Sequence, residues 1–438
     1  MLERIFALSA HGTNVRTEAL AGATTFLTMA YIIAVNPSIL SAAGLPVPAV
    51  AAATCLSAGI ASIMMGLFAN YPLALAPGMG LNAYFTYSVV LGMGVPWQTA
   101  LGCVFISGVA FFLLTLAGVR QMILRAMPKP LLAATAAGIG LFIAFIGLKN
   151  AGLIVTNPAT FVTLGDLKTP TALLTLLGLG VIAGLQAWKV KGAMLIGIVV
   201  ISIIGWFLGL SHWDGWTFGP AALSETAFKL DIPAAFNLGG SFGVALLEII
   251  FVFLFVDLFD NVGTLAAVTK RAGLQTEDGS IPRLNRVLYT DSAATMIGSL
   301  AGTTTVTSYI ESASGIAVGG RTGLTAVVTG LLFLLALFLA PLVGLVPAAA
   351  TAPALILVGA MMMAPLAEVE WDSPLDALPA FLTVIMIPLT FSIANGLAFG
   401  ITSYAVLKLV TGKAKASDWM LFVLGALFVA RFAFLAAG

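Results

Sequence analysis

The chain has 438 residues, of which 60% are hydrophobic and only 8% are charged, and its formal net charge is +1. A soluble domain of this length carries far more charge, so the composition indicates a polytopic membrane protein. The near-neutral balance gives no sign of a nucleic-acid partner.

Apolar runs occupy most of the sequence, and a helix needs about 20 apolar residues to span a membrane. The runs lie at roughly 18–40, 48–69, 71–92, 97–117, 129–149, 170–187, 193–211, 240–268, 287–300, 302–319, 322–346, 352–366, 376–391 and 395–411, with a shorter one at 418–436. The sequence therefore predicts an all-α membrane protein with about fourteen spanning segments. The last run either spans the membrane or lies along its cytoplasmic surface.

The basic residues are distributed unevenly over the turns between these runs. With a cytoplasmic N-terminus, 15 of the 19 Lys and Arg residues fall on the cytoplasmic side and three on the opposite side. An excess of Lys and Arg in cytoplasmic turns is the usual signature of orientation. We therefore predict a multi-pass protein of the cell membrane, with the bacterial inner membrane as the expected location.

The third run contains a cluster of helix-breaking residues, namely Pro72, Pro77, Gly78 and Gly80. Proline removes a backbone donor and glycine weakens a helix, so a continuous helix is not expected here. We predict a short extended stretch, a break from Pro77 to Gly80 and a half-helix that starts near Leu81. Asn82, just inside this half-helix, is either a helix cap or a substrate contact.

The eighth run carries two aspartates, Asp257 and Asp260, in otherwise apolar surroundings. A carboxylate at bilayer depth costs at least a few kcal/mol, so such a residue usually faces a protein interior and has a function. Three positions apart, the two share a helix face. The alternative is that they pair with a buried cation or cap a broken helix. Phe259, between them, is a candidate stacking surface.

The tenth run begins Gly302-Thr-Thr-Thr-Val-Thr-Ser-Tyr-Ile-Glu-Ser, and its β-branched residues favour an extended conformation. The helix is expected to resume near Tyr309, with Glu311 close to its start. Glu311 is either a substrate contact or a simple helix-starting carboxylate. Asp291, in the ninth run, is expected to tie its helix to neighbouring N–H groups. Glu18 and Glu248 are interpreted as side chains that reach the membrane surface, outside any site.

Irregular backbone at membrane depth is tolerated only where protein or a water-filled cavity supplies hydrogen-bond partners. The residues Ala34-Val-Asn-Pro-Ser-Ile-Leu resemble Phe259-Asp-Asn-Val-Gly-Thr-Leu at an offset of 225, and Asn82 and Glu311 are 229 apart. Halves of seven spans each are necessarily inverted. Two breaks at equivalent places therefore predict a substrate site at the midplane of a secondary transporter.

The sequence lacks the motifs that several alternative functions would require. No Gly-x-Gly-Asp element of an intramembrane aspartyl protease and no Gly-x-x-x-x-Gly-Lys-Ser/Thr phosphate loop is found. Both histidines, His11 and His212, fall outside the apolar runs, so no histidine base is expected inside the membrane. We predict a carrier, with no cofactor other than the proton as co-transported ion, and a channel is the alternative from another class.

Three segments together resemble the AzgA-like purine permeases, a branch of the nucleobase–cation symporter superfamily that includes the uracil and xanthine permeases. They are Ala76-Pro-Gly-Met-Gly-Leu-Asn-Ala-Tyr-Phe, Phe255-Val-Asp-Leu-Phe-Asp-Asn-Val-Gly-Thr and Gly302-Thr-Thr-Thr-Val-Thr-Ser-Tyr-Ile-Glu-Ser-Ala-Ser-Gly. The resemblance runs from about Thr17 to Val410.

The resemblance implies fourteen segments in two inverted repeats of seven, with short extended stretches in segments 3 and 10. A core domain would comprise residues 17–120 and 240–346, and a gate domain would comprise 128–211 and 352–411. The segment 412–438 lies outside this pattern. In the family, the core domain moves against the gate domain like an elevator, import is coupled to protons, and the gate domain tends to mediate a homodimer.

The resemblance also assigns the site. The family's eighth-segment aspartates fall on Asp257 and Asp260, its tenth-segment glutamate on Glu311, its third-segment asparagine on Asn82 and its ninth-segment acid on Asp291. We predict substrate binding by Asp257, Glu311, Asn82, Gly80, Phe259 and Ser312, and proton coupling or orientation by Asp260 and Asp291. Uracil carriers have a glutamate followed by histidine where this chain has Asp260-Asn261, which disfavours uracil.

The predicted function is the import of purine nucleobases, namely hypoxanthine, adenine and guanine, by proton symport. Ionised carboxylates only accept hydrogen bonds, so they suit the N–H groups of a purine, and backbone N–H groups at the breaks suit its ring nitrogens. An anion exchanger of the same architecture is the alternative among carriers, although buried acids disfavour an anionic substrate.

Overall fold

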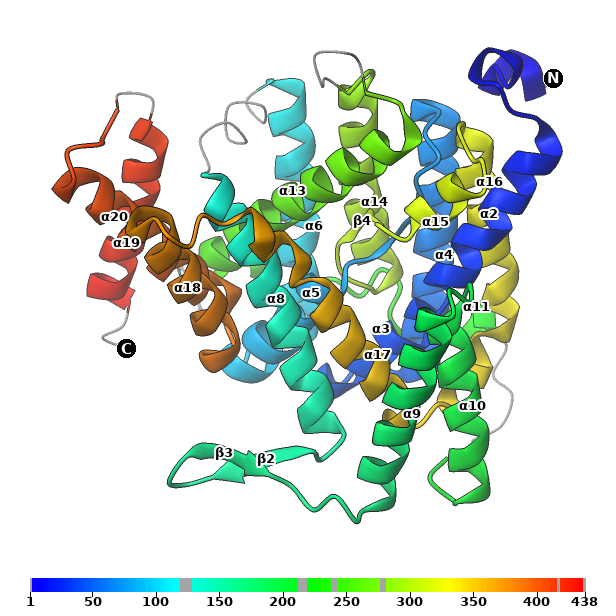
Figure 1. Ribbon diagram of the computed structural model, residues 1–438, viewed down its shortest axis with the longest axis horizontal. Coiled ribbons are helices and arrows are strands. Elements are labelled where there is room, and N and C mark those ends of the chain that lie inside the picture. Colours follow the sequence, from blue (N-terminus) through cyan, green and yellow to red (C-terminus); the bar gives the residue numbers. More distant parts are fainter. Residues whose placement is uncertain are drawn as a thin grey trace. The chain divides into compact units, whose positions relative to one another are not determined.

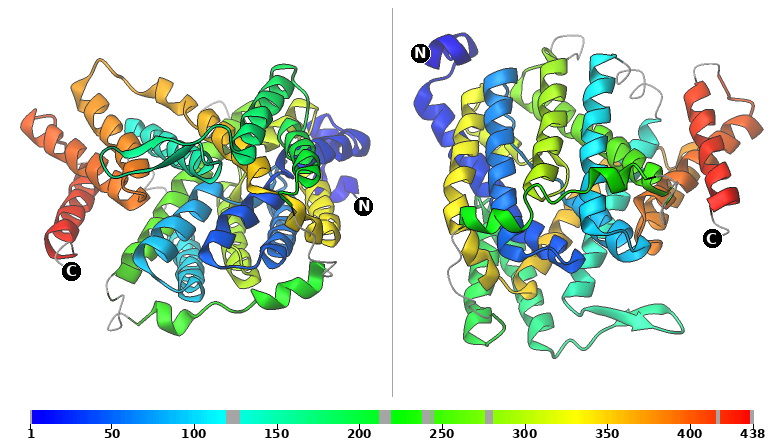
Figure 2. Two further views of the ribbon diagram at one scale, coloured as in Figure 1. Left: turned by 90° about the horizontal axis from the view of Figure 1, so that it is seen from below. Right: turned by 180° about the vertical axis from the view of Figure 1, so that it is seen from behind.

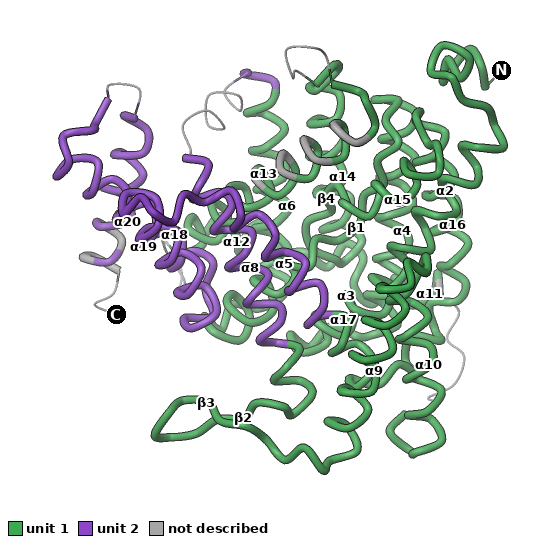
Figure 3. The backbone as a smooth tube through the Cα atoms, in the orientation of Figure 1, with its two compact units in different colours: residues 1–115, 147–354 green, residues 116–146, 355–438 purple. Residues whose placement is uncertain are grey.

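The computed structural model describes residues 2–118, 128–211, 219–237, 243, 245–275, 281–415 and 418–435. Most of these residues are helical (Figure 1). The contacts within the chain define two compact units: residues 1–115 with 147–354, and residues 116–146 with 355–438 (Figure 3).

Eight helical stretches in the described ranges are long and apolar enough to cross a membrane, by length and composition. They are Val15–Ala43, Val47–Ala69, Trp97–Leu116, Lys129–Asn150, Pro170–Ala187, Gly323–Leu345, Ala348–Glu368 and Ile393–Val410. Shorter apolar helices lie at Ala193–Phe207, Pro374–Leu389 and Trp419–Ala430. The prediction of a helical, multi-pass membrane protein is confirmed.

The first unit begins with α1 (Leu2–Phe6), α2 (Val15–Met29), α3 (Ile32–Leu40), α4 (Val47–Met64), α5 (Met79–Ala83) and α6 (Trp97–Leu116). Its middle part holds the hairpin of β2 (Ile154–Asn157) and β3 (Phe161–Leu164), then α9 (Pro170–Ala187), α10 (Ala193–Phe207), α11 (Gly219–Ala222) and α12 (Ile232–Ala235). Its last part holds α13 (Ala245–Ala272), α14 (Leu284–Ala301), α15 (Ser312–Ala317) and α16 (Gly323–Ala336). Two of these helices, α4 and α5, continue as π-helical segments, Met65–Ala69 and Tyr84–Gly92.

Helix α16 packs against both α2 and α4 in this unit (Figures 1 and 2). Glycines set their separation. A Cβ atom added at Gly22 of α2 would lie 2.6 Å from the carbonyl oxygen of Thr325, and one added at Gly59 of α4 would lie 3.0 Å from that of Gly330. Small residues at such crossings let two backbones approach, which is the common way of packing helices in membranes.

The third and tenth predicted runs each contain a short strand. The strand β1 (Leu75–Pro77) pairs antiparallel with β4 (Val306–Ser308), and Ala76 lies opposite Thr307. Two backbone hydrogen bonds extend this ladder, from the N–H of Gly78 to Thr305 and from the N–H of Tyr309 to Ala74, both 3.0 Å long. A short helix follows each strand: α5 begins two residues after the end of β1, and α15 begins four residues after the end of β4.

The strand β1 is also tied to side chains on both sides of it. The hydroxyl of Ser62 in α4 accepts from the N–H of Leu75 at 2.9 Å, and the hydroxyl of Ser312 accepts from the N–H of Ala74 at 3.0 Å. Buried backbone groups need such partners because no water reaches them.

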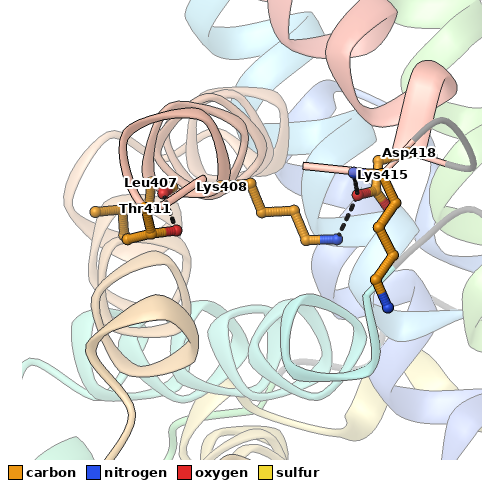
Figure 4. Close-up of polar contacts among 5 residues, drawn as sticks. All are labelled: Leu407, Lys408, Thr411, Lys415 and Asp418. Atoms are coloured by element: carbon orange, nitrogen blue, oxygen red, sulfur yellow. Dashed lines mark hydrogen bonds and ion pairs between the residues drawn. The ribbon is translucent and has the colours of Figure 1, made fainter. Parts of the chain in front are cut away.

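The second unit contains the first part of α8 (Lys129–Asn150), the last part of α17 (Ala348–Met361), α18 (Pro374–Leu389), α19 (Ile393–Val410) and α20 (Trp419–Leu435). Phe391, between α18 and α19, packs edge-on against Phe142 and Phe145 of α8. The Nζ atom of Lys408 in α19 forms an ion pair with Asp418, directly before α20, at 2.8 Å (Figure 4).

Candidate functional site

The paired strands place the starts of α5 and α15 in one region of the first unit. Gly78 begins α5 in an extended conformation, and Glu311 begins α15. Neither of these two residues caps its helix through a side-chain hydrogen bond. Pro77, which has no N–H group, ends β1 without leaving a donor unpaired. Most of the residues predicted to form the site lie on or next to these elements.

Glu311 is held by a tyrosine from the first span. The hydroxyl of Tyr31 donates to the Oε1 atom of Glu311 at 2.6 Å. Tyr31 is fully buried and lies in the break between α2 and α3. The hydroxyl of Tyr309, two residues before Glu311, donates to the carbonyl oxygen of Pro77. The start of α15 is thus fixed to both α3 and β1.

Asp260 faces the same region as Glu311. Helix α13, which carries Asp260, packs against both α15 and β4, the elements on either side of Glu311. Asp260 is half-buried, in contrast to its neighbours Asp257 and Asn261, which are buried. The structure therefore brings Asp260 of α13 and Glu311 of α15 together, although 51 residues separate them in the sequence.

Asp257 is tied to α14. The hydroxyl of Thr295 lies 3.2 Å from the Oδ2 atom of Asp257 and 3.3 Å from the carbonyl oxygen of Val306 in β4. Asp257 is 2% exposed. Asp291 lies one turn before Thr295 on α14 and is fully buried.

Asn82 lies in α5 within a buried network of amides and hydroxyls. Its Nδ2 atom donates to the Oδ1 atom of Asn36 at 2.6 Å, and its Oδ1 atom accepts from the hydroxyl of Thr304. Asn36 in turn donates to the hydroxyls of Thr54 and Thr303, each at 2.8 Å. The amide of Asn82 therefore links the half-helix α5 to α3 and to the residues before β4.

The remaining predicted residues have different environments. Gly80 lies in the first turn of α5 and is half-buried. Ser312 is buried, and its hydroxyl holds the backbone of β1 as described above. Phe259 belongs to α13, but its side chain lies outside the described residues.

Sequence reasoning did not single out three residues here: Tyr31, Asn36 and Asn261. Asn261 is fully buried, and neither its Nδ2 nor its Oδ1 atom has a hydrogen-bond partner among the described residues. A buried amide without hydrogen-bond partners is unusual in native proteins and needs an explanation, such as a functional role or a bound water or ion. The sequence similarity between residues 34–40 and 259–265 could have identified two of them, because it aligns Asn36 with Asn261.

The interpretation of Glu18 as a side chain that reaches the membrane surface is wrong. Glu18 is fully buried. Its carboxylate accepts hydrogen bonds from the N–H groups of Arg321, Thr322 and Thr325 and from the hydroxyl of Thr325 at 2.6 Å. A carboxylate is favourable at a helix N-terminus, where backbone N–H groups lack partners. Glu18 thus caps α16 from α2.

Known proteins resemble this chain over most of its length. The family model described as the Permease family matches residues 16–399. The adenine permease AdeP of Escherichia coli (strain K12) is 48% identical over 100% of this chain and 97% of its own. The guanine/hypoxanthine permease PbuG of Bacillus subtilis (strain 168) is 44% identical over 99% of this chain and 100% of its own.

The solved structure of the transmembrane domain of the cyanobacterial bicarbonate transporter BicA covers 87% of this chain and 97% of its own, with a TM-score of 0.66 and 17% identity. At that identity, the likeness shows a common fold. The family and the relatives named above are transporters, so the chain is not an enzyme. The resemblance to the AzgA-like purine permeases of the nucleobase–cation symporter superfamily is confirmed, and the chain belongs to the Permease family.

Proposed function

We propose that this protein is a secondary active transporter that imports purine nucleobases by proton symport. The observation that carries the proposal is that two acids, Glu311 at the start of α15 and Asp260 of α13, belong to elements that pack together next to the paired strands β1 and β4. Acids buried at membrane depth are expensive and are kept for substrate or ion pathways. The end-to-end identity to permeases named for adenine and for guanine and hypoxanthine supports a purine as the substrate.

The chemistry of the region suits a purine. Hypoxanthine, adenine and guanine each carry N–H donors and ring-nitrogen acceptors on one flat heterocycle. Glu311 and one of the two aspartates, Asp257 or Asp260, accept from N–H groups when they are ionised. The amide of Asn261 offers one acceptor and two donors, so it can pair with a donor–acceptor edge of the base. Charge-assisted hydrogen bonds of this kind are both stronger and more selective than neutral ones.

We further propose the fourteen-segment architecture of two inverted repeats, with a core domain (17–120 and 240–346) that moves against a gate domain (128–211 and 352–411). Equivalent features recur at similar offsets, since β1 and β4 start 231 residues apart and Asn36 and Asn261 are 225 apart. Repeats of this kind, with the site at interrupted segments, are the usual basis of alternating access.

We also propose that transport is coupled to protons and that the protein lies in the bacterial inner membrane with a cytoplasmic N-terminus. The gate domain is proposed to mediate a homodimer. Asp260 and Glu311 support proton coupling, since a carboxylate inside a membrane protein can change between an ionised and a protonated form during transport. A protonated acid changes from acceptor to donor, so proton uptake and substrate binding are linked.

Uptake of radiolabelled hypoxanthine, adenine and guanine into proteoliposomes, with and without an inward proton gradient, tests the function. Saturable uptake that accumulates above the external concentration only with the gradient supports symport. Passive equilibration indicates a channel, and gradient-independent uptake of bicarbonate or chloride in exchange for an internal anion indicates an anion exchanger.

The same assay tests the site. Asp257→Ala and Glu311→Gln are expected to reduce purine uptake strongly while the protein stays in the membrane. Asp166→Asn, in the exposed loop before α9, is the matched control for loss of a carboxylate and is expected to leave uptake unchanged. Normal uptake by either site variant would contradict the assignment of that residue.

A further inference from the structure

Tyr31 has a buried phenol side chain, and none of the predicted site residues lies on the same span. It lies where the first span changes from α2 to α3, and it is fully buried. Its hydroxyl donates to Glu311 Oε1 at 2.6 Å, across 280 residues of sequence. A phenol has one O–H, so this donation uses its only proton.

The backbone around Glu311 is fixed by other contacts. Gly315 of α15 packs so closely on α2 that an added Cβ atom would lie 2.6 Å from the carbonyl oxygen of Ala21. Glu18, also on α2, accepts from the N–H groups of Arg321 and Thr322, which follow α15. Helix α15 is therefore held against α2 without any contribution from Tyr31.

What the Tyr31 hydroxyl controls is the orientation of the Glu311 side chain. A glutamate has three rotatable side-chain bonds, and ordering such a side chain has an entropic cost. A hydrogen bond to Oε1 restricts the rotation of the carboxylate and so limits the directions in which Oε2 can point. Preorganised acceptors bind more tightly because less ordering remains when the ligand arrives.

We propose that Tyr31 is a positioning residue, which holds the carboxylate of Glu311 in the orientation that accepts an N–H group of the purine. This assignment rests on the proposed function. Removing the hydroxyl frees one carboxylate oxygen and lets the side chain rotate. Because charge-assisted hydrogen bonds in a buried site are strong, we expect Tyr31→Phe to weaken purine binding by about tenfold.

The test is the Kd of purified protein for hypoxanthine, measured calorimetrically, together with KM and Vmax in proteoliposomes. Tyr31→Phe is expected to raise Kd and KM about tenfold and to leave Vmax within about twofold of the wild type, because affinity alone is affected. Tyr71→Phe is the matched control, since Tyr71 is also buried and its hydroxyl donates to the carbonyl oxygen of Pro282. The control is expected to keep the wild-type Kd.

A double-mutant cycle separates positioning from a general structural role. Glu311→Asp shortens the side chain by one methylene and takes the carboxylate out of reach of the hydroxyl of Tyr31. In that background, Tyr31→Phe is expected to change Kd by less than about twofold. An equal change of Kd in both backgrounds, or an unchanged Kd of Tyr31→Phe alone, overturns the assignment. A wild-type protein that binds none of the three purines refutes the proposed function itself, and the role of Tyr31 with it.

Discussion

The buried carboxylate of Glu18 provides a sharp test of how the first unit is held together. Glutamine at this position keeps the shape of the side chain but removes its charge and turns one acceptor into a donor. The three hydrogen bonds from Thr322 and Thr325 converge on Oε2, so the amide oxygen of the variant will occupy that place. The amide NH₂ then faces the N–H of Arg321, which donates to Oε1 at 2.8 Å in the native protein.

The variant thus loses one charge-assisted hydrogen bond, weakens three others and leaves a buried N–H group unpaired. Hydrogen bonds to charged groups contribute roughly 1.5–3 kcal/mol, and an unpaired buried donor costs about 1–3 kcal/mol. Since the three retained bonds keep part of their strength, we expect Glu18→Gln to lower the free energy of unfolding by about 2–4 kcal/mol.

Thermal unfolding of the detergent-solubilised protein, followed by intrinsic fluorescence, measures this loss. A shift of that size lowers the midpoint by roughly 5–10 °C. Glu3→Gln is the matched control, because the carboxylate of Glu3 also accepts a backbone hydrogen bond, from Ser9 at 3.0 Å, but is exposed. A midpoint for Glu18→Gln equal to that of Glu3→Gln would refute the argument that burial gives this cap its strength.

Three further predictions concern other parts of the chain. Asn261→Leu removes an amide that has no protein partner among the described residues. It is expected to raise the Kd for purines at least about tenfold without lowering the unfolding midpoint. An unchanged Kd would contradict a contact between Asn261 and the ligand. Gly323→Ala places a methyl group against the backbone of Gly66, so it is expected to destabilise the protein by about 1–3 kcal/mol, whereas Gly184→Ala meets open space and is the neutral control. The pKa of Asp418 is held below its ordinary value: partial burial opposes this, but the hydrogen bonds and charges of Lys408 and Lys415 outweigh it. A lowered pKa adds stability that is present above the unfolded pKa and is lost as the pH falls through the folded value. The attachment of α20 to α19 is therefore expected to persist at pH 5 and to loosen only below about pH 4. The fluorescence of Trp419 reports this change, and a change at pH 5–6 that is equally large in Asp418→Asn would contradict a role of the ion pair.

The irregular segments were predictable because their cause is local. Prolines and glycines from Pro72 to Gly80, and the threonines after Gly302, disfavour a helix by their own chemistry. The acids within apolar runs likewise led to the prediction of carboxylates at membrane depth. Such features depend on a few neighbouring residues and need no knowledge of the fold.

The partners of the polar side chains were not predictable, because they come from distant segments. Glu18 and Thr325 are 307 residues apart, and Tyr31 and Glu311 are 280 apart. A glutamate at the start of an apolar run has the same local sequence whether it reaches the membrane surface or caps a distant helix. Likewise, the helical spacing of Asp257 and Asp260 predicts a shared face but does not say that Thr295 lies beside the first and Glu311 beside the second.

The pairing of β1 with β4 has a consequence for how the protein is made. Residues 75–77 leave the ribosome long before residues 306–308, yet neither strand has another strand to pair with in the described chain. The N–H and C=O groups of β1 therefore lack their strand partner while more than half of the chain is synthesised, and contacts of such high sequence separation form slowly. We infer that Ser62, which already pairs with both the N–H and the C=O of Leu75, shields β1 during this interval, so that the pairing of β1 with β4 is completed only when the second half of the chain is inserted.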